Sequence, residues 1–133
     1  MKSFAVTLLL LVLLLLGVVA NHLYINKVAN EMFRQLDALP PMEDPDCLPK
    51  VSALVDYWQS QSTTVEVSVN FLLIDRVNEQ TALLLACATA GDLYGFASAR
   101  VLLRDAVEDV LRFEQLTAGT CLLPPSPQKA EKE

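Results

Sequence analysis

Hydrophobic residues are concentrated in one run near the amino terminus. Residues 4–20 contain no charged side chain and consist mainly of Leu and Val; with residues 22–25 the stretch reaches about 20 residues. That length crosses a hydrocarbon core of about 30 Å at about 1.5 Å per residue. A helix of a water-soluble protein would keep a polar face, and this run has none. The pattern therefore predicts a membrane segment over residues 1–25.

Two interpretations of this segment compete. The positive Lys2, the Leu-rich core and the Val18-x-Ala20 step before Asn21 fit a cleavable secretory signal. Residues 21–39 favour an uncleaved anchor, because they contain no helix breaker and continue one apolar helical face. That face consists of Val28, Met32, Leu36 and Leu39. We favour the anchor and keep secretion as the alternative.

The charges flanking the segment bear on its orientation. Lys2 is positive, but Lys27 and Arg34 on the other side are positive too. Because whole domains translocate largely regardless of their charge, we expect the amino terminus inside and the rest of the chain extracytoplasmic.

The next apolar pattern predicts a short helix over residues 47–60. Pro40-Pro41 ends the preceding helix, and Asp46 is placed to cap the new one. The expected core positions recur at helical spacing and are Leu48, Val51, Val55 and Trp58. The polar residues 59–62 predict a break.

Residues 63–90 are predicted to form one further helix. The alternation over residues 65–69 is typical of a strand, but the chain offers no second strand to pair with it. Thr63 and Glu66 instead form a capping box before an apolar run. The predicted apolar surface contains Val69, Leu72, Leu73, Val77, Leu83 and Leu84.

The last helix is predicted over residues 93–116. Gly91 suits a left-handed position after one helix, Asp92 can cap the next, and Gly119 is expected to close it. The helical stripe comprises Phe96, Ala99, Leu103, Val107, Val110 and Leu111. So short a turn predicts an antiparallel αα-hairpin, with small residues such as Gly95 allowing close approach.

These elements predict an all-α fold in which the membrane helix continues into a small helical domain ending in the long hairpin. We divide the chain into a membrane segment at 1–25, a helical extracytoplasmic domain at 26–119 and a disordered tail at 120–133. The tail assignment rests on its prolines and charges.

Composition excludes several classes of function. The 133 residues carry a net charge of −6, with a pI near 4.7, and an acidic protein lacks the basic surface that nucleic-acid binding requires. The chain contains no Gly-x-Ser-x-Gly motif and no glycine-rich phosphate loop. We therefore expect no enzyme, no catalytic residue, no cofactor and no metal site.

Charged residues offer one candidate interaction patch, which consists of Asp75, Arg76 and Glu79. The alternative is an ordinary solvated face in which Arg76 and Glu79 pair at i, i+3. A second set, at Arg100, Arg104, Glu108 and Arg112, steps by four and is typical of an exposed helix face that pairs with itself. His22 is expected at the membrane edge.

The three cysteines match no zinc or redox spacing. Cys87 is expected to be a small buried residue. Cys47 and Cys121 are expected as free thiols, with a disulfide between them as the alternative.

With the helices placed, the chain resembles the DUF4363 family of small, uncharacterised, membrane-anchored proteins from Firmicutes. The resemblance rests on the leading membrane helix, on Tyr57-Trp58, on Phe71-Leu-Leu-Ile-Asp75 with Glu79, on Asp92, and on Leu102-Leu103 through Glu114. Where family members commonly carry His, this chain has Arg76. The resemblance implies a helical fold and a membrane location, and it implies no activity.

The functional expectation is an interaction or structural module at the cell envelope. Its expected partners are the lipid bilayer and another envelope protein or a second copy of the chain, without nucleic acid. The alternative is a helical domain that binds a lipid or small hydrophobic ligand, secreted after cleavage at Ala20.

Overall fold

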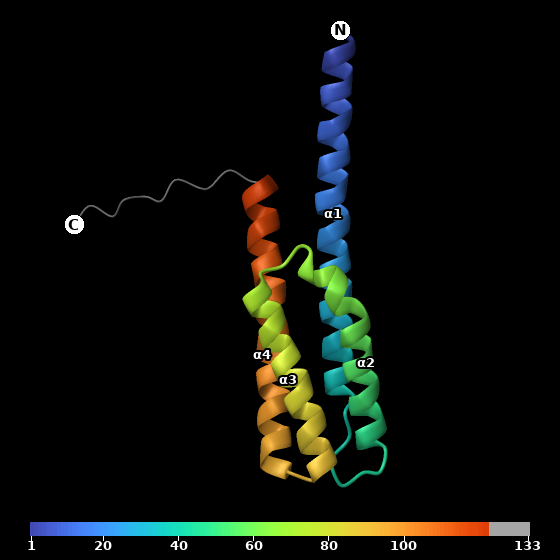
Figure 1. Cartoon of the computed structure of the whole chain (residues 1–133), viewed down its shortest axis with the longest axis vertical. Coiled ribbons are helices and arrows are strands. Elements are labelled where there is room, and N and C mark those ends of the chain that lie inside the picture. The colour runs from blue at the N-terminus through green and yellow to red at the C-terminus, as the bar shows by residue number, and fades with distance from the viewer. Residues whose placement is uncertain (123–133) are drawn as a thin grey trace, which may run out of the picture.

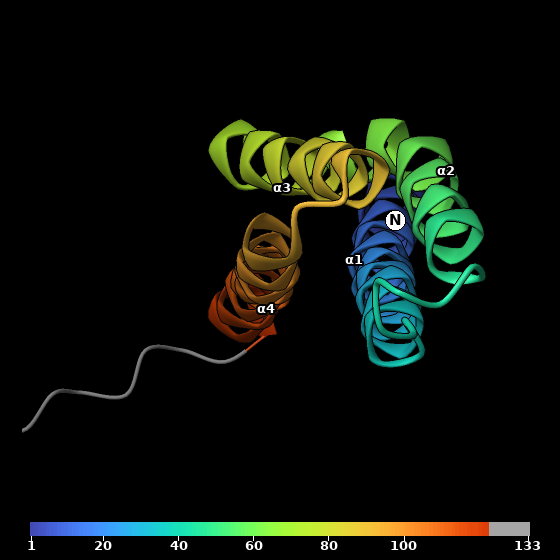
Figure 2. The ribbon, with the colours of Figure 1, turned by 90° about the horizontal axis from the view of Figure 1, so that it is seen from below.

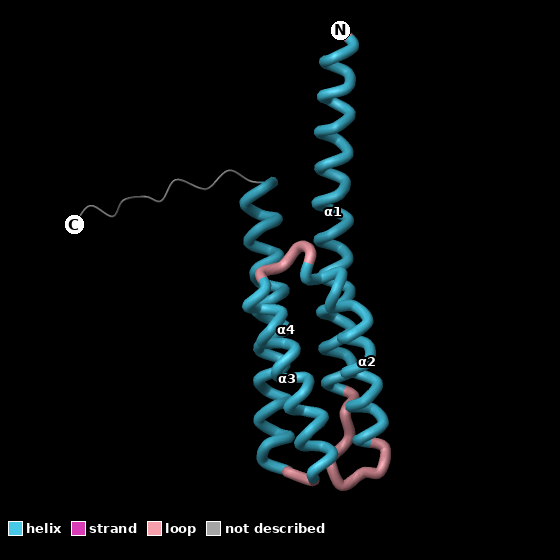
Figure 3. Tube along the Cα trace, viewed as in Figure 1, coloured by secondary structure: helices cyan, strands magenta, loops and turns pink. Residues whose placement is uncertain are grey.

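A computed structural model describes residues 1–122, apart from the side chains of residues 118 and 120–122. The described residues form four helices, and they contain no strand (Figures 1 and 3). The helices are α1 (Lys2–Asp37), α2 (Cys47–Glu66), α3 (Phe71–Ala90) and α4 (Leu93–Leu122). The predicted all-α fold is confirmed: residues 65–69 form the end of α2 and the turn after it, and the strand that their alternation suggested is absent, as expected.

The second half of α1 packs with the other three helices into a bundle, while its first half projects beyond them (Figure 1). Each helix contacts its neighbour along the chain, and α1 also contacts α4, so the four helices close a ring. The view along the bundle shows them at four corners (Figure 2). The predicted antiparallel hairpin of α3 and α4 is confirmed.

The single helix α1 has two different environments. Leu10 and Leu14 are 60% and 64% exposed, whereas Met32 and Leu36 are 0% and 1% exposed. The face predicted from Val28 to Leu39 is buried throughout. Since α1 runs unbroken to Asp37 and Ala38 caps it just before Pro40-Pro41, the predicted continuation of the apolar N-terminal helix into the bundle is confirmed.

The junction between α2 and α3 differs from the prediction. The expected break at residues 59–62 is absent from the described helix, and α2 continues to Glu66. The Ser60 and Ser62 hydroxyls donate to the carbonyls of Tyr57 and Gln59, at 2.7 and 3.1 Å, so these polar residues satisfy themselves within the helix. Burial of Val65 to 1% exposure adds a packing reason for α2 to continue.

The true cap of α3 is Asn70, whose side-chain oxygen accepts a hydrogen bond from the Leu72 backbone N–H at 2.9 Å. The predicted single helix over 63–90 and its capping box at Thr63 are therefore wrong. This start also turns Leu72 outward, to 72% exposure. Leu48 and Leu83, at 41% and 44% exposure, are the other expected core residues that lie at the surface.

The turn between α3 and α4 follows the prediction. Gly91 adopts φ 75°, the left-handed conformation that favours glycine. The Asp92 carboxylate accepts a hydrogen bond from the Gly95 N–H at 3.0 Å. A Cβ atom at Gly95 would clash most closely with the Asp92 carboxylate and would lie 2.7 Å from the Cys87 sulfur, so glycine suits both the cap of α4 and its close approach to α3.

The end of α4 lies beyond the predicted one. The helix passes through Gly119 and reaches Leu122, because a glycine in right-handed conformation weakens a helix by about 1 kcal/mol without ending it. Within the predicted tail at 120–133, residues 123–133 lie outside the described residues.

Candidate membrane-proximal site

The projecting half of α1 is the most conspicuous apolar surface of the described chain. Within the 36 residues of α1, an 18-residue window has a mean hydropathy of 2.9, and none of that window is buried. A helix of this length and composition is able to cross a membrane, and a signal sequence has the same properties. This exposed apolar surface ends where α1 enters the bundle.

A polar cluster lies where the apolar half of α1 ends. Its members are Asn21, His22 and Asn26 of α1 and Glu114 of α4. The Asn21 amide donates to Glu114 Oε1 at 3.3 Å, and the Asn26 amide lies 3.1 Å from His22 Nε2. Glu114 is only 3% exposed, although glutamate side chains are almost never fully buried unless they are paired.

Within this cluster the imidazole and the carboxylate are neighbours without a direct hydrogen bond. His22 Nδ1 lies 3.9 Å from Glu114 Oε1, and Nδ1 is buried with no hydrogen-bond partner. A buried polar atom without a hydrogen-bond partner is costly. The cluster connects α4 to α1 at the end of the bundle from which the apolar half of α1 projects.

Two further polar contacts connect α2 to its neighbours. The Tyr24 hydroxyl of α1 donates to the side-chain oxygen of Gln61, and Trp58 Nε1 donates to Asn78 Oδ1 at 2.7 Å on α3. Burial raises the pKa of the Tyr57 hydroxyl, and the nearby Glu31 carboxylate raises it further. The Tyr24–Gln61 and Trp58–Asn78 hydrogen bonds fix the position of α2 along the bundle axis relative to α1 and α3.

The candidate patch of Asp75, Arg76 and Glu79 lies on the exposed side of α3. Its cation pairs across the hairpin, with Arg76 Nη1 2.7 Å from Asp109 Oδ2 of α4. The i, i+3 partner expected from the sequence is thus replaced by a carboxylate 33 residues away. The three residues share a face, and the one ion pair described there joins α3 to α4.

The charged ladder on α4 pairs partly with itself and partly with α1. Arg104 lies 3.8 Å from Glu108, and Arg112 lies 3.6 Å from Asp109. Arg104 also donates to the Asp37 carboxylate and lies 5.2 Å from the centre of the Phe33 ring. The hydrogen bond with Asp37 raises the pKa of Arg104. This face of α4 therefore also contacts the C-terminal end of α1, through Asp37 and Phe33.

The exposed side of α1 carries one well-formed ion pair. Arg34 Nη2 lies 2.6 Å from Glu31 Oε1, and the Gln35 amide donates to the same oxygen at 3.0 Å. These two hydrogen bonds lower the pKa of Glu31 to about 2.

Cys47 and Cys87 are free and buried, at 2% and 7% exposure, as predicted for Cys87. Burial raises the pKa of the Cys47 thiol, and the Asp44 carboxylate adds to the effect. Cys121 is in the last turn of α4, at the opposite end of the bundle from the start of α2 (Figure 1). The alternative of a Cys47–Cys121 disulfide is therefore wrong for this fold.

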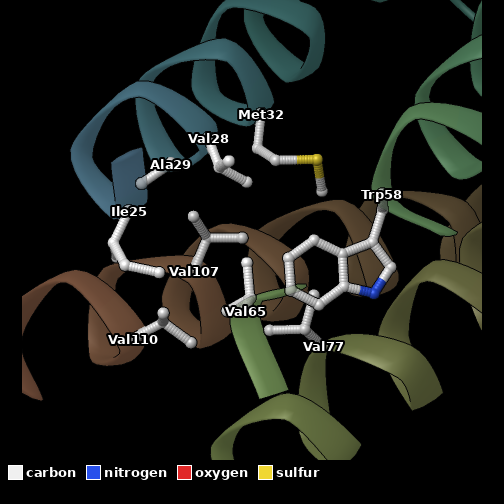
Figure 4. A pocket seen from close by; sticks show the side chains of 9 residues that line it. All are labelled: Ile25, Val28, Ala29, Met32, Trp58, Val65, Val77, Val107 and Val110. Carbon is white, nitrogen blue, oxygen red and sulfur yellow. The ribbon is translucent and has the colours of Figure 1, made fainter. Parts of the chain in front are cut away.

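The bundle interior offers little space for a ligand. Nine apolar side chains from all four helices surround a cavity of about 10 Å³ (Figure 4), which is roughly the space needed for one water. An open groove of about 590 Å³ lies between α2 and α3, with Trp58 and Asn78 in its wall. Among the described residues, no three His, Cys, Asp or Glu side chains gather to hold a metal ion.

Comparison with known proteins adds no relative. No protein-family model, no curated protein and no solved structure matches the chain. The resemblance to the DUF4363 family therefore stays a sequence-based prediction.

Proposed function

We propose that this protein is a single-pass membrane protein whose α1 anchors a helical bundle at the extracytoplasmic surface of the membrane, where the bundle serves as an interaction or structural module. One observation carries the proposal: α1 is a single helix, exposed and apolar at its start and buried in the bundle core at its end. An anchor joined to its domain in this way has no flexible linker, so the bundle is held in a defined orientation.

The polar cluster supports an uncleaved anchor. The Ala20–Asn21 bond, at which a signal peptidase would cut, lies in the middle of α1, and the Asn21 side chain is hydrogen bonded to Glu114. Proteolysis requires local opening of the chain. Cleavage after folding would have to unwind this part of α1 and would leave Glu114 buried beside a new terminus.

The surface of the bundle supports a role in binding rather than in catalysis. Residues 21–123 carry seven basic and fourteen acidic residues, a net charge of −7. An acidic domain complements a basic partner better than a second copy of itself, because like charges repel at an interface. The small central cavity gives no support to lipid carriage in the bundle core. We therefore favour another envelope protein as the partner.

The test is the intact mass of the protein recovered from carbonate-washed membranes. A mass that begins at Met1, allowing for formylation or removal of Met, is expected for a permanent anchor. Recovery in the soluble fraction with a mass beginning at Asn21 would show a secreted domain instead. Orientation is tested in the same cells by adding protease outside: the bundle should be degraded in intact spheroplasts, and a cytoplasmic control protein should survive.

A further inference from the structure

Four large apolar side chains are exposed at the end of the bundle from which α1 projects. Val67, Phe71 and Leu72, in and beside the α2–α3 turn, are 87%, 69% and 72% exposed, and Leu116 on α4 is 66% exposed. Figure 1 shows this turn and the end of α4 on the same side of the bundle as the projecting half of α1. We call these four residues the membrane-proximal apolar surface.

The hydrogen bond between Asn21 and Glu114 sets the height of α4 relative to α1. From Glu114, α4 runs antiparallel to α1 for eight more residues, to Leu122, a rise of about 12 Å. The end of α4 therefore lies level with roughly residue 13 of α1, inside the apolar run. Residues 115–122 contain no charged side chain, as a segment at that depth requires.

The contact between Tyr24 and Gln61 sets the height of α2 in the same way. From Gln61 the helix continues five residues to Glu66, about 7 Å toward the apolar half of α1. The turn that follows is uncharged from Val67 to Ile74. Two independent contacts thus bring two separate uncharged segments to the level at which α1 becomes apolar.

We propose that the membrane-proximal apolar surface docks into the lipid bilayer around α1, with the end of α4 in the outer part of the hydrocarbon layer and the α2–α3 turn at its interface. The proposal rests on the proposed anchoring by α1. Lipid is the favoured occupant because the surface is continuous with the span of α1, which is itself surrounded by lipid. A second copy of the chain would have to displace lipid from the same place.

Docking of this kind gives the bundle three attachments to the membrane instead of one. Rotation or tilting of the bundle about α1 would pull Phe71 and Leu72 out of an apolar environment. The charged faces of α3 and α4 and the groove between α2 and α3 then point sideways, along the membrane plane. A partner would therefore be a neighbouring membrane protein that contacts the side of the bundle, and not a protein that approaches from the aqueous phase above it.

The experiment uses the full chain in phosphatidylcholine vesicles, with an environment-sensitive fluorophore on one introduced cysteine in a C121S background. The labelled variants are Leu72→Cys on the surface, Leu13→Cys in the span, and Tyr94→Cys, 91% exposed at the opposite end. Quenching by brominated lipid and by aqueous iodide is compared. We expect Leu13→Cys and Leu72→Cys to be quenched at least threefold more by brominated lipid than Tyr94→Cys, and iodide to quench only Tyr94→Cys.

Other outcomes overturn the proposal in distinguishable ways. If Leu13→Cys is quenched by lipid and Leu72→Cys by iodide, docking is wrong while the anchor stands. Protection of Leu72→Cys from both quenchers would mean that protein, such as a second copy, covers the surface. If lipid fails to quench Leu13→Cys, the proposed anchor fails, and docking with it.

A second variant tests the side chains themselves. Val67→Ser with Phe71→Ser, in the Leu72→Cys protein, should reduce lipid quenching at least twofold and admit iodide. Leu93→Ser, a matched change at a residue 52% exposed at the distant end, should leave both values unchanged. Unchanged quenching in the double variant would contradict docking through this surface.

Discussion

Leu83 and Leu84 are adjacent on α3, and the structure gives them opposite surroundings. Leu84 is fully buried, at 0% exposure, whereas Leu83 is 44% exposed. Replacing each by Ala makes the same chemical change on the same helix, so helix propensity cancels in the comparison. The difference in free energy of unfolding between the two variants therefore reports how much more deeply Leu84 is buried than Leu83.

The expected magnitude follows from this burial. Leu84→Ala removes three buried carbon groups worth about 0.8 kcal/mol each, and the cavity left behind raises the total to about 3–4 kcal/mol. Leu83 is roughly half exposed, and Ala is slightly the better helix former, so Leu83→Ala should cost less than about 1 kcal/mol. The two variants should therefore differ by at least about 2 kcal/mol.

Trp58 provides the assay, because it is the only tryptophan and is 3% exposed in the core. Urea unfolding of the full chain in a mild nonionic detergent is followed by its fluorescence. With an m-value of about 1–3 kcal/mol per molar urea, a difference of about 2 kcal/mol separates the two midpoints by roughly 0.7–2 M. Equal midpoints for the two variants, or a lower one for Leu83→Ala, would refute the described packing of α3.

Three further predictions concern other parts of the bundle. The pKa of Glu31 is lowered to about 2 from 4.5. Its contribution to stability is therefore complete above about pH 4.5 and is lost as the pH falls toward 2. Over this range the free energy of unfolding should depend less steeply on pH in Glu31→Gln than in the unsubstituted protein. Native protein should react with a maleimide at Cys47 and Cys87 at least tenfold more slowly than unfolded protein, as peptide mass mapping will show, because both thiols are buried; equal rates would contradict their burial. Gly95→Ala should lower the free energy of unfolding by about 1–3 kcal/mol, because the added Cβ clashes with the Asp92 carboxylate and with the Cys87 sulfur. Gly119→Ala has nothing within 4 Å of the added Cβ and should be neutral or stabilising. A reversed order would contradict the described packing around the α3–α4 turn.

The α2–α3 junction shows where sequence patterns mislead. Thr63 and Glu66 have the spacing of a capping box, and residues 59–62 have the polarity of a break. Both signals are local, and the packing of Val65 into the core outweighs them. The Asn70 cap was a readable signal, because Asn is a preferred N-cap residue, but several competing caps lie within eight residues of it.

The polar cluster was only half visible in the sequence. His22 was expected at the membrane edge, and the structure places it where the apolar half of α1 ends. Glu114 resembled any other acidic residue of an exposed helix face. Its burial beside Asn21, which is 93 residues away in the chain, depends on the packing of α1 against α4. No spacing rule predicts a contact of that kind.

The sequence alone determined the all-helical class, the unbroken course of α1 from its apolar run into the bundle, and the hairpin turn at Gly91. Each of these depends on local chemistry: a long uncharged run, an absence of breakers before Pro40, and a residue that tolerates positive φ. Only the tertiary structure decided which leucines are buried, where α2 ends, and that Arg76 pairs with Asp109 and Glu114 with Asn21. Those outcomes depend on which face of a helix its neighbours cover, and the energy of that contact is large enough to override weak local preferences.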